Sequence, residues 1–105
     1  MIIVAYKKQY LKTRPVCKVS FRLSKAATGS AKNVNIVGEF NGWNIYATPM
    51  RRLKSGDFTI TIDLNINKEY QYRYLIDDMI WENDWQADKY VSSPYGDCEN
   101  SVVVV

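Results

Sequence analysis

Apolar and polar side chains alternate along three stretches of this chain, and this two-residue period is typical of a half-buried β-strand. Apolar residues occupy every second position in the stretches 17–23, 58–64 and 70–76. Such alternation places the apolar side chains on one face of an extended segment and the polar ones on the other. No stretch keeps the period of an amphipathic helix. The chain is therefore predicted to be an all-β protein built from antiparallel strands.

Turn-forming residues separate the alternating stretches. Gly, Asn, Asp, Ser and Pro gather at 27–30, 41–42, 54–57, 65–68, 77–78 and 92–97. These residue types favour tight turns, and the β-branched run 102–105 adds a last short strand. Short strands with turns at this spacing indicate an immunoglobulin-like β-sandwich of about seven antiparallel strands.

The length of the chain limits what it can contain. Its 105 residues suffice for one two-layer core and are far too few for a catalytic barrel of about 250 residues. The apolar start is too short for a signal peptide, and no stretch approaches the roughly 20 apolar residues of a membrane span. We expect a cytoplasmic protein without membrane association. Residues 1–14 are expected to be an N-terminal extension, either an added strand or a short helix, and residues 15–105 to be the sandwich.

The cysteine and histidine content restricts the chemistry. The chain has no His and only two cysteines, Cys17 and Cys98. His-based acid–base catalysis and the usual tetrahedral zinc site are excluded, and we expect neither a metal nor a cofactor. First and last strands can be neighbours in a sandwich, so a disulfide is geometrically conceivable. A cytoplasmic chain is normally kept reduced, and Cys17 is therefore interpreted as a small buried hydrophobe.

The net charge of +3 is modest, but the charges are unevenly placed. Basic residues crowd the first quarter of the chain, where they suit either an acidic partner such as a nucleic acid or a solvated edge strand. The second interpretation is favoured, and no nucleic-acid partner is expected. Acidic residues crowd the segment 77–88. Clustered carboxylates suit calcium, but the segment lacks the D-x-D-x-D-G loop pattern, so solvated turns are favoured there.

Two tryptophans stand at positions where a core residue would not be expected. Trp43 follows the Gly/Asn turn 41–42, and Trp81 follows the turn after the stretch 70–76, which also carries Arg73. A Trp side chain buries roughly 150–250 Å², so at a polar turn it is either a lid over the core or a flat platform for a ligand. Alternation directs Arg73 away from the core side. Two flat apolar surfaces with a nearby donor suit a sugar, which offers a face of C–H bonds and a rim of hydroxyls.

The same residues carry a family resemblance that extends from about residue 15 to 105. The motif G-x-F-N-x-W at 38–43 is followed by Q-Y-R-Y-L-I-D at 71–77, then Trp81, an Asn-Asp pair and the terminal N-S-V-V-V. This order resembles the glycogen-binding module of the AMP-activated protein kinase β subunit. It is similar as well to the N-terminal early-set domain of isoamylases and branching enzymes, grouped as carbohydrate-binding module family 48.

The resemblance implies a set of sugar-binding residues. Trp43 and Trp81 match the two stacking tryptophans of the kinase module, and Arg73 takes the place of its sugar-contacting lysine. Tyr95 stands where that module has a leucine, and Asp97 stands where it has a threonine. The remaining match is the asparagine near the last strand, which is Asn100 or, if the match is off by one position, Glu99. Trp85 is interpreted either as a third platform or as a residue that closes the site.

Three classes of function follow from these interpretations. The leading hypothesis is a non-catalytic module that binds α-glucans such as glycogen or starch through Trp43, Arg73, Trp81, Tyr95 and Asn100. The alternative is a protein-interaction or regulatory module that partners a glucan-metabolising enzyme or a kinase without binding sugar. An enzyme is the least favoured, because glycosidases need two carboxylates that flank the scissile bond and nothing marks Glu82 and Asp84 for that role.

Overall fold

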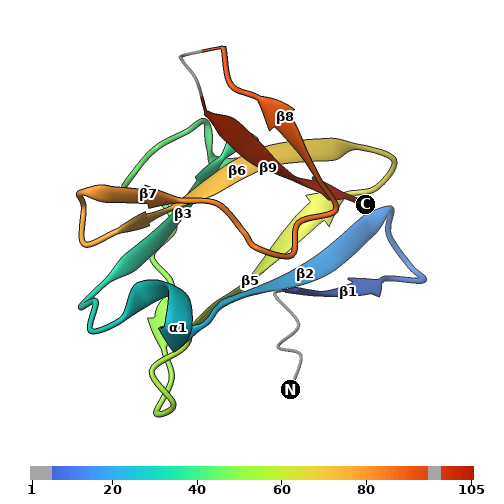
Figure 1. The fold of residues 1–105 in the computed structure, drawn as a ribbon. Helices are drawn as coiled ribbons and strands as arrows, with labels where there is room; N and C mark the ends of the chain where they lie inside the picture. Colours follow the sequence, from blue (N-terminus) through green and yellow to red (C-terminus); the bar gives the residue numbers. More distant parts are fainter. Residues whose placement is uncertain (1–5, 95–97) are drawn as a thin grey trace.

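Two antiparallel sheets pack face to face in this protein (Figure 1). The structure, a computed structural model, describes residues 6–94 and 98–105. It confirms the predicted all-β sandwich. The described residues form nine strands, more than the seven expected, because two short strands of two and three residues, at 51–52 and 80–82, join the regular ones.

The first sheet has four strands in the order β1-β2-β5-β4. Its long strands are the ones that alternation predicted. The strand bounds are Tyr6–Tyr10 for β1, Val16–Leu23 for β2, Arg51–Arg52 for β4 and Phe58–Asn65 for β5. β2 and β5 pair along eight residues, from Val16 opposite Asn65 to Leu23 opposite Phe58. The first sheet thus rests on one long antiparallel pair, to which β1 and β4 add short edges.

The second sheet carries the residues that the sequence marked for function. Its path is β3-β6-β9-β8, and β7 pairs with the remaining part of β6. β6 is the central strand, because it pairs with β3 on one side and with β9 and β7 on the other. The strand bounds are Val34–Gly38 for β3, Glu69–Ile76 for β6, Ile80–Glu82 for β7, Lys89–Ser92 for β8 and Glu99–Val104 for β9.

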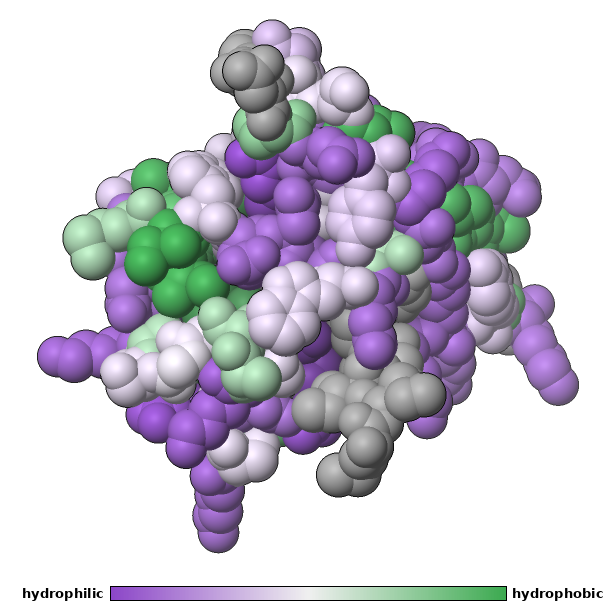
Figure 2. Space-filling model, in the orientation of Figure 1, coloured by the Kyte–Doolittle hydropathy of each residue, from purple (hydrophilic) through white to green (hydrophobic). Residues whose placement is uncertain are grey.

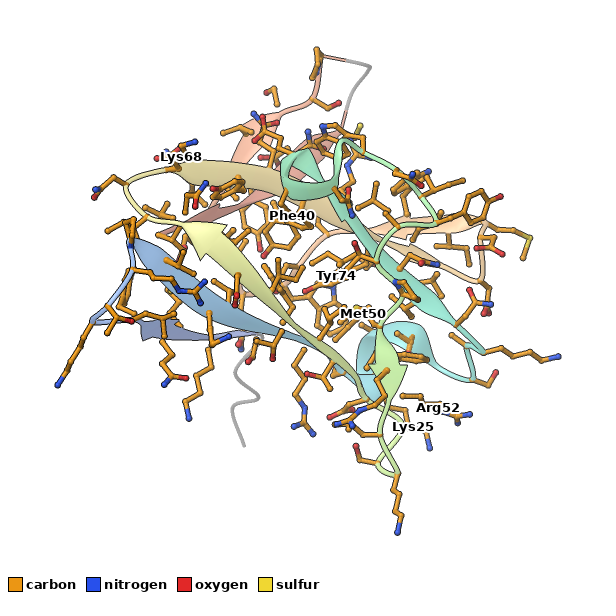
Figure 3. The ribbon with its side chains drawn as sticks, turned by 180° about the vertical axis from the view of Figure 1, so that it is seen from behind. Lys25, Phe40, Met50, Arg52, Lys68 and Tyr74 are labelled. Atoms are coloured by element: carbon orange, nitrogen blue, oxygen red, sulfur yellow. The ribbon has the colours of Figure 1, made fainter. Side chains whose placement is uncertain are left out.

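The core lies between the two sheets and is rich in aromatic rings. Phe21 of β2 contacts Tyr72 of β6 in an edge-to-face arrangement with ring centroids 5.1 Å apart. Tyr72 meets Tyr74 in the same way at 5.9 Å, and such geometry is favoured between aromatic rings. Figure 3 shows Phe40 and Tyr74 pointing into the space between the sheets. Tyr72 and Tyr74 are fully buried, which confirms the face assigned to them by alternation.

Helical structure in the described residues is limited to two short pieces. α1 comprises Lys25–Thr28 and follows β2, and the 3-10 helix η1 comprises Glu39–Asn41 and follows β3. α1 begins at the backbone N–H of Lys25, which donates to Asp57 Oδ1 at 2.8 Å. No helix in the described ranges is long and apolar enough to cross a membrane.

The start of the described chain is a strand, one of the two alternatives left open by the sequence. β1 pairs with β2 from Tyr6 opposite Phe21 to Tyr10 opposite Cys17. Its Lys8 Nζ also lies 2.8 Å from Asp88 Oδ2, in the segment that leads to β8 of the other sheet. Residues 6–10 therefore extend the first sheet and connect it with the second. The boundary expected at residue 15 stays a prediction.

The two cysteines form no disulfide, and basic residues of the first quarter of the chain form ion pairs. Cys17 is buried and Cys98 is exposed, and both are free thiols. Lys18 Nζ pairs with Asp63 Oδ1 at 3.0 Å, and Arg22 Nη2 pairs with Asp57 Oδ2 at 2.7 Å. These pairs neutralise part of the basic charge on the outer face of the first sheet.

Candidate functional site

The motif that ends β3 is shaped by a close approach between two strands. Gly38 lies opposite Tyr72 of β6. A Cβ atom at Gly38 would come within 2.5 Å of the Gln71 backbone oxygen and 2.7 Å of Tyr72 Cβ. Real side chains essentially never approach backbone so closely, so only glycine allows β3 to end in contact with β6. This glycine thus fixes where β3 ends beside β6 and where the following turn begins.

Asn41 holds the turn that follows. Its Oδ1 accepts a hydrogen bond from the Gly38 backbone N–H at 3.1 Å. Its Nδ2 donates to the Ile36 carbonyl and to Thr48 Oγ1, both at 3.0 Å. One side-chain amide therefore binds three points of the loop, and the neighbouring Phe40 anchors the same turn in the aromatic core, with its ring centroid 6.0 Å from that of Phe21.

Trp43 is held out from this turn by its backbone conformation. It has a φ of 59°, in the left-handed region, directly after Gly42 with a φ of 65°. Left-handed backbone costs a non-glycine residue roughly 1–2 kcal/mol, and the Trp43 N–H offsets part of that cost by donating to the Gly38 carbonyl at 2.9 Å. The Trp43 residue is 40% exposed and lies outside the core cluster. This placement favours a platform over a lid.

Trp81 reaches the same face of the sheet from a tight hairpin. Asp77 and Asp78 both have left-handed φ angles, 51° and 58°, and the Met79 N–H donates to the Ile76 carbonyl at 3.1 Å. Two positive φ angles in sequence are the signature of a type I′ turn, which matches the twist of hairpin strands. Trp81 then pairs with Leu75 of β6 and is 45% exposed.

Arg73 lies on the outer face of β6 and is held by two residues at or just before the start of β9. Its Nε donates to Asn100 Oδ1 of β9 at 2.6 Å, and its Nη2 lies 2.9 Å from Cys98 Sγ. Asn100 in turn donates from Nδ2 to Gln71 Oε1 at 2.9 Å. Asn100 is only 4% exposed. The guanidinium of Arg73 is thus fixed by a buried amide, and it points outward from the strand as alternation predicted.

These side chains line one open groove of about 450 Å³ on the outer face of the second sheet. Four of the five predicted sugar-binding residues lie together in it, and the fifth, Tyr95, lies outside the described residues. The full lining consists of Glu39, Trp43, Gln71, Arg73, Trp81, Ser92, Ser93, Pro94, Cys98 and Asn100. The groove combines two exposed indole rings with a fixed guanidinium, so it offers both flat apolar area and hydrogen-bonding groups.

Sequence reasoning missed the polar members Glu39 and Gln71. Glu39 Oε1 accepts a hydrogen bond from the Gln71 backbone N–H at 2.6 Å, just beyond the point where β3 stops pairing with β6. Gln71 was recognisable, since alternation places it on the same face as Arg73. Glu39 lies inside the motif at 38–43, but its contact depends on the register between β3 and β6.

Trp85 does not line this groove. It is 60% exposed, and its indole Nε1 donates to Glu82 Oε1 at 3.3 Å. Met79 and Ile80 of the preceding hairpin are likewise exposed. Figure 2 shows hydrophobic side chains gathered at the left of the view, where β7 lies in Figure 1. Neither interpretation of Trp85 is therefore seen among the described residues, because a residue outside the groove neither closes it nor serves as its third platform.

The acidic segment is used for structure. Asp77 Oδ1 accepts the backbone N–H groups of Lys32 and Asn33 at 2.8 and 3.0 Å, and Asp88 pairs with Lys8. In the described part of the chain, no group of three or more metal-binding side chains lies close enough to hold an ion. Asp77 and Asp88 therefore anchor this segment to the rest of the sandwich.

Asp84 is buried in the core beneath the groove. Its Oδ2 accepts the hydroxyls of Tyr72 and Tyr74 at 2.7 and 3.1 Å, and its Oδ1 accepts the Gln86 N–H at 2.9 Å. Burial raises the pKa of Asp84, although these hydrogen bonds act in the opposite direction. A buried carboxyl with a raised pKa beside tyrosines resembles a catalytic acid, but Asp84 is 1% exposed and does not line the groove. Its role is to satisfy two buried tyrosines.

Comparison with known proteins identifies the family. The sequence profile of Carbohydrate-binding module 48 (Isoamylase N-terminal domain) matches residues 26–96, which include the Gly38–Trp43 motif, Arg73 and Trp81. A search of curated proteins found no significant match to the chain. The matched segment covers more than half of the chain and carries most of the groove. The chain belongs to carbohydrate-binding module family 48.

Proposed function

We propose that this module binds α-glucans of the glycogen or starch type without modifying them. The observation that carries the proposal is the convergence of Trp43, Trp81 and Arg73 on one groove. Each indole supplies a flat apolar face for the C–H side of a glucose ring. Arg73 supplies planar hydrogen-bond donors for the hydroxyl rim.

Membership in a family of carbohydrate-binding modules supports a sugar ligand in general. The choice of an α-glucan rests on the likeness of Trp43 and Trp81 to the stacking pair of the kinase module. An open groove with two half-exposed rings buries little ligand surface, so we expect dissociation constants between micromolar and millimolar, or about −8 to −4 kcal/mol.

The composition of the groove supports binding without catalysis. Glycosidases of the common mechanisms place two carboxylates about 5–10 Å apart on either side of the scissile bond. Among the described residues that line the groove, Glu39 is the only one with a carboxylate. The buried Asp84 lies beneath the groove and has no access to a ligand there.

The proposal is tested by titration of the protein with maltoheptaose and with β-cyclodextrin while tryptophan fluorescence is recorded. We expect a saturable change with both sugars, and retention of the protein on amylose resin. Cellohexaose, a β-linked glucan, is the control and is expected to give no saturable change. Absence of binding to both α-linked ligands would contradict the proposal.

A second candidate function is a protein-interaction module that partners a glucan-metabolising enzyme. The observation that favours it is the exposed apolar surface of Met79, Ile80 and Trp85, which lies outside the groove. In that case the protein would pass through amylose resin unretained. Substitution of Ile80 by Ser would then weaken association with the enzyme, whereas substitution of Trp43 by Ala would not.

A further inference from the structure

The charged part of the described groove consists of one donor, Arg73, and one acceptor, Glu39, beside the neutral hydroxyls of Ser92 and Ser93. Arg73 contributes only N–H donors. The amide of Asn100 is committed on both sides, to Arg73 and to Gln71, and Gln71 Oε1 is committed to Asn100. Glu39 remains as the one negatively charged acceptor among the described lining residues.

The position of the Glu39 carboxylate is fixed by one of its two oxygens. Oε1 accepts the Gln71 backbone N–H at 2.6 Å, which is the short distance of a charge-assisted hydrogen bond. No hydrogen bond joins the second oxygen, Oε2, to any part of the protein that the structure describes. Glu39 itself is exposed. One oxygen therefore holds the carboxylate in place at the groove, and the other remains available to a ligand.

A glucose hydroxyl both donates and accepts hydrogen bonds. Arg73 cannot accept the hydroxyl protons of a bound sugar, and an unpaired polar group removed from water costs free energy. A carboxylate that accepts from hydroxyls forms charge-assisted bonds, which are about twice as strong as neutral ones. Glu39 thus complements Arg73 in the recognition of a neutral sugar.

The two charges also determine which glucans the groove excludes. Arg73 and Glu39 bring one positive and one negative charge to the described lining, so their charges balance. A phosphate monoester carries a charge of about −1.5 to −2 near pH 7, and the Glu39 carboxylate repels it. Without the Glu39 charge, Arg73 alone would make the groove cationic and attract such an ester.

We propose that Glu39 is the specificity-determining residue of the groove, where it accepts sugar hydroxyls and selects neutral glucans over phosphorylated ones. This inference rests on the proposed function of glucan binding. It assigns a role to a residue for which neither the motif nor the strand pattern predicted one.

The test compares maltoheptaose with maltoheptaose that carries phosphate monoesters, measured by fluorescence titration at low and at high salt. The wild-type protein should prefer the neutral sugar. Glu39→Gln keeps an oxygen for the Gln71 N–H but removes the charge. It should weaken maltoheptaose binding about 5–10-fold and should shift the preference toward the phosphorylated sugar by about 10-fold or more, and high salt should reduce that gain.

Two further variants serve as controls. Glu69→Gln changes the net charge of the protein by the same amount as Glu39→Gln. Glu69 lies on β6, pairs with Lys89 and does not line the groove, so the preference of this variant for the neutral sugar should equal that of the wild type. Glu39→Asp keeps the negative charge and should keep the discrimination against phosphate. For each variant, the affinity for maltoheptaose is divided by the affinity for its phosphorylated form. A partly unfolded fraction lowers the binding capacity for both sugars alike, so it leaves this ratio unchanged.

The outcomes separate this inference from the function on which it rests. If the wild-type protein binds no maltoheptaose, the proposed function fails and Glu39 loses its role with it. If the wild type binds and Glu39→Gln shows an unchanged preference, only the role of Glu39 is overturned. An equal shift in Glu39→Gln and Glu69→Gln would likewise overturn it, because the effect would then come from net charge.

Discussion

Arg73 and Asn100 lie on adjacent strands, and the Nε of the arginine donates to the Oδ1 of the asparagine at 2.6 Å. The asparagine is 4% exposed, and its Nδ2 is engaged by Gln71 Oε1 at 2.9 Å. This geometry places Asn100 behind Arg73. We therefore expect it to act on a ligand chiefly as a positioning residue for the guanidinium.

A double-mutant cycle tests this relationship. Arg73→Met should weaken maltoheptaose binding by about 1–3 kcal/mol, because sugar hydroxyls lose their donors. Asn100→Ser should weaken it in the wild-type background but add little once Arg73 is methionine, since the asparagine acts through the arginine. Binding is measured by fluorescence titration. Additive losses would show that Asn100 contacts the sugar by itself.

Trp43 and Trp81 are expected to contribute to binding far more than to stability. Each is 40–45% exposed and lies outside the core cluster, so Trp43→Ala and Trp81→Ala should each abolish retention on amylose and change the melting temperature little. Trp85→Ala is the matched control, since it removes an exposed indole outside the groove, and should leave retention intact. Unchanged retention in either variant, or a collapse of the fold, would identify the residue as a lid over the core.

Gly38→Ala is expected to destabilise the sandwich and distort the groove. The added Cβ would meet the Gln71 carbonyl at 2.5 Å, so β3 must move away from β6, at a cost of about 1–3 kcal/mol. Gly42→Ala is the control, because a Cβ atom there would have no other atom within 4 Å and only its φ of 65° is strained. Urea unfolding of the two variants measures the difference, and an equal loss in both would argue against the close approach.

Asp57 should make the stability of the fold dependent on acid pH. The pKa of Asp57 lies below the ordinary value of 3.8, chiefly because the Lys25 backbone N–H donates to its carboxylate and then because Arg22 does. The unfolded state therefore binds the proton first, so this stabilisation is complete above pH 3.8 and is lost as the pH falls through the folded pKa. Asp57→Asn should cost about 1–3 kcal/mol at pH 7.

Asp84 should act in the opposite sense. Burial raises its pKa above 3.8, so the folded state binds the proton more tightly than the unfolded state. The contribution of this group is largest below pH 3.8 and declines as the pH rises through the folded pKa. Urea unfolding between pH 3 and 7 measures both effects. On acidification, the wild type should gain stability relative to Asp84→Asn. The stability advantage of the wild type over Asp57→Asn should instead shrink.

The features that the sequence could predict are those set by neighbours along the chain. Alternation in β6 indicated both the strand and the opposite directions of Tyr72 and Arg73, because side chains of one strand change face at every residue. The turn residues before Trp43 and Trp81 narrowed each ring to two alternatives, a lid over the core or a platform for a ligand, and the resemblance favoured the platform. These local rules suffice for the fold class and for the outward direction of Arg73, whereas the choice of Trp43, Trp81 and Asn100 as binding residues came from the family resemblance.

The remaining features depend on contacts between distant segments. Glu39 is placed by an N–H of Gln71 that lies beyond the end of β3, and Asn100 is committed to Arg73 by the register of β9 beside β6. The same applies to Trp85, whose position outside the groove follows from the path of the chain after β7. The register between strands and the path of the chain are decided by the packing of the whole sandwich. A local sequence pattern contains no information about that packing.

The groove draws its side chains from five separate parts of the second sheet: the turn after β3, the central strand β6, the hairpin strand β7, the end of β8 with the residues that follow it, and the last strand β9 with Cys98 before it. A chain that had paired both β3 and β7 with β6 but had not yet added β9 would already present both indoles, while the guanidinium of Arg73 would lack its anchor. Sugar binding therefore reports completion of the native topology. During refolding, recovery of the glucan signal should coincide with docking of the final strand and should lag behind the first appearance of β structure.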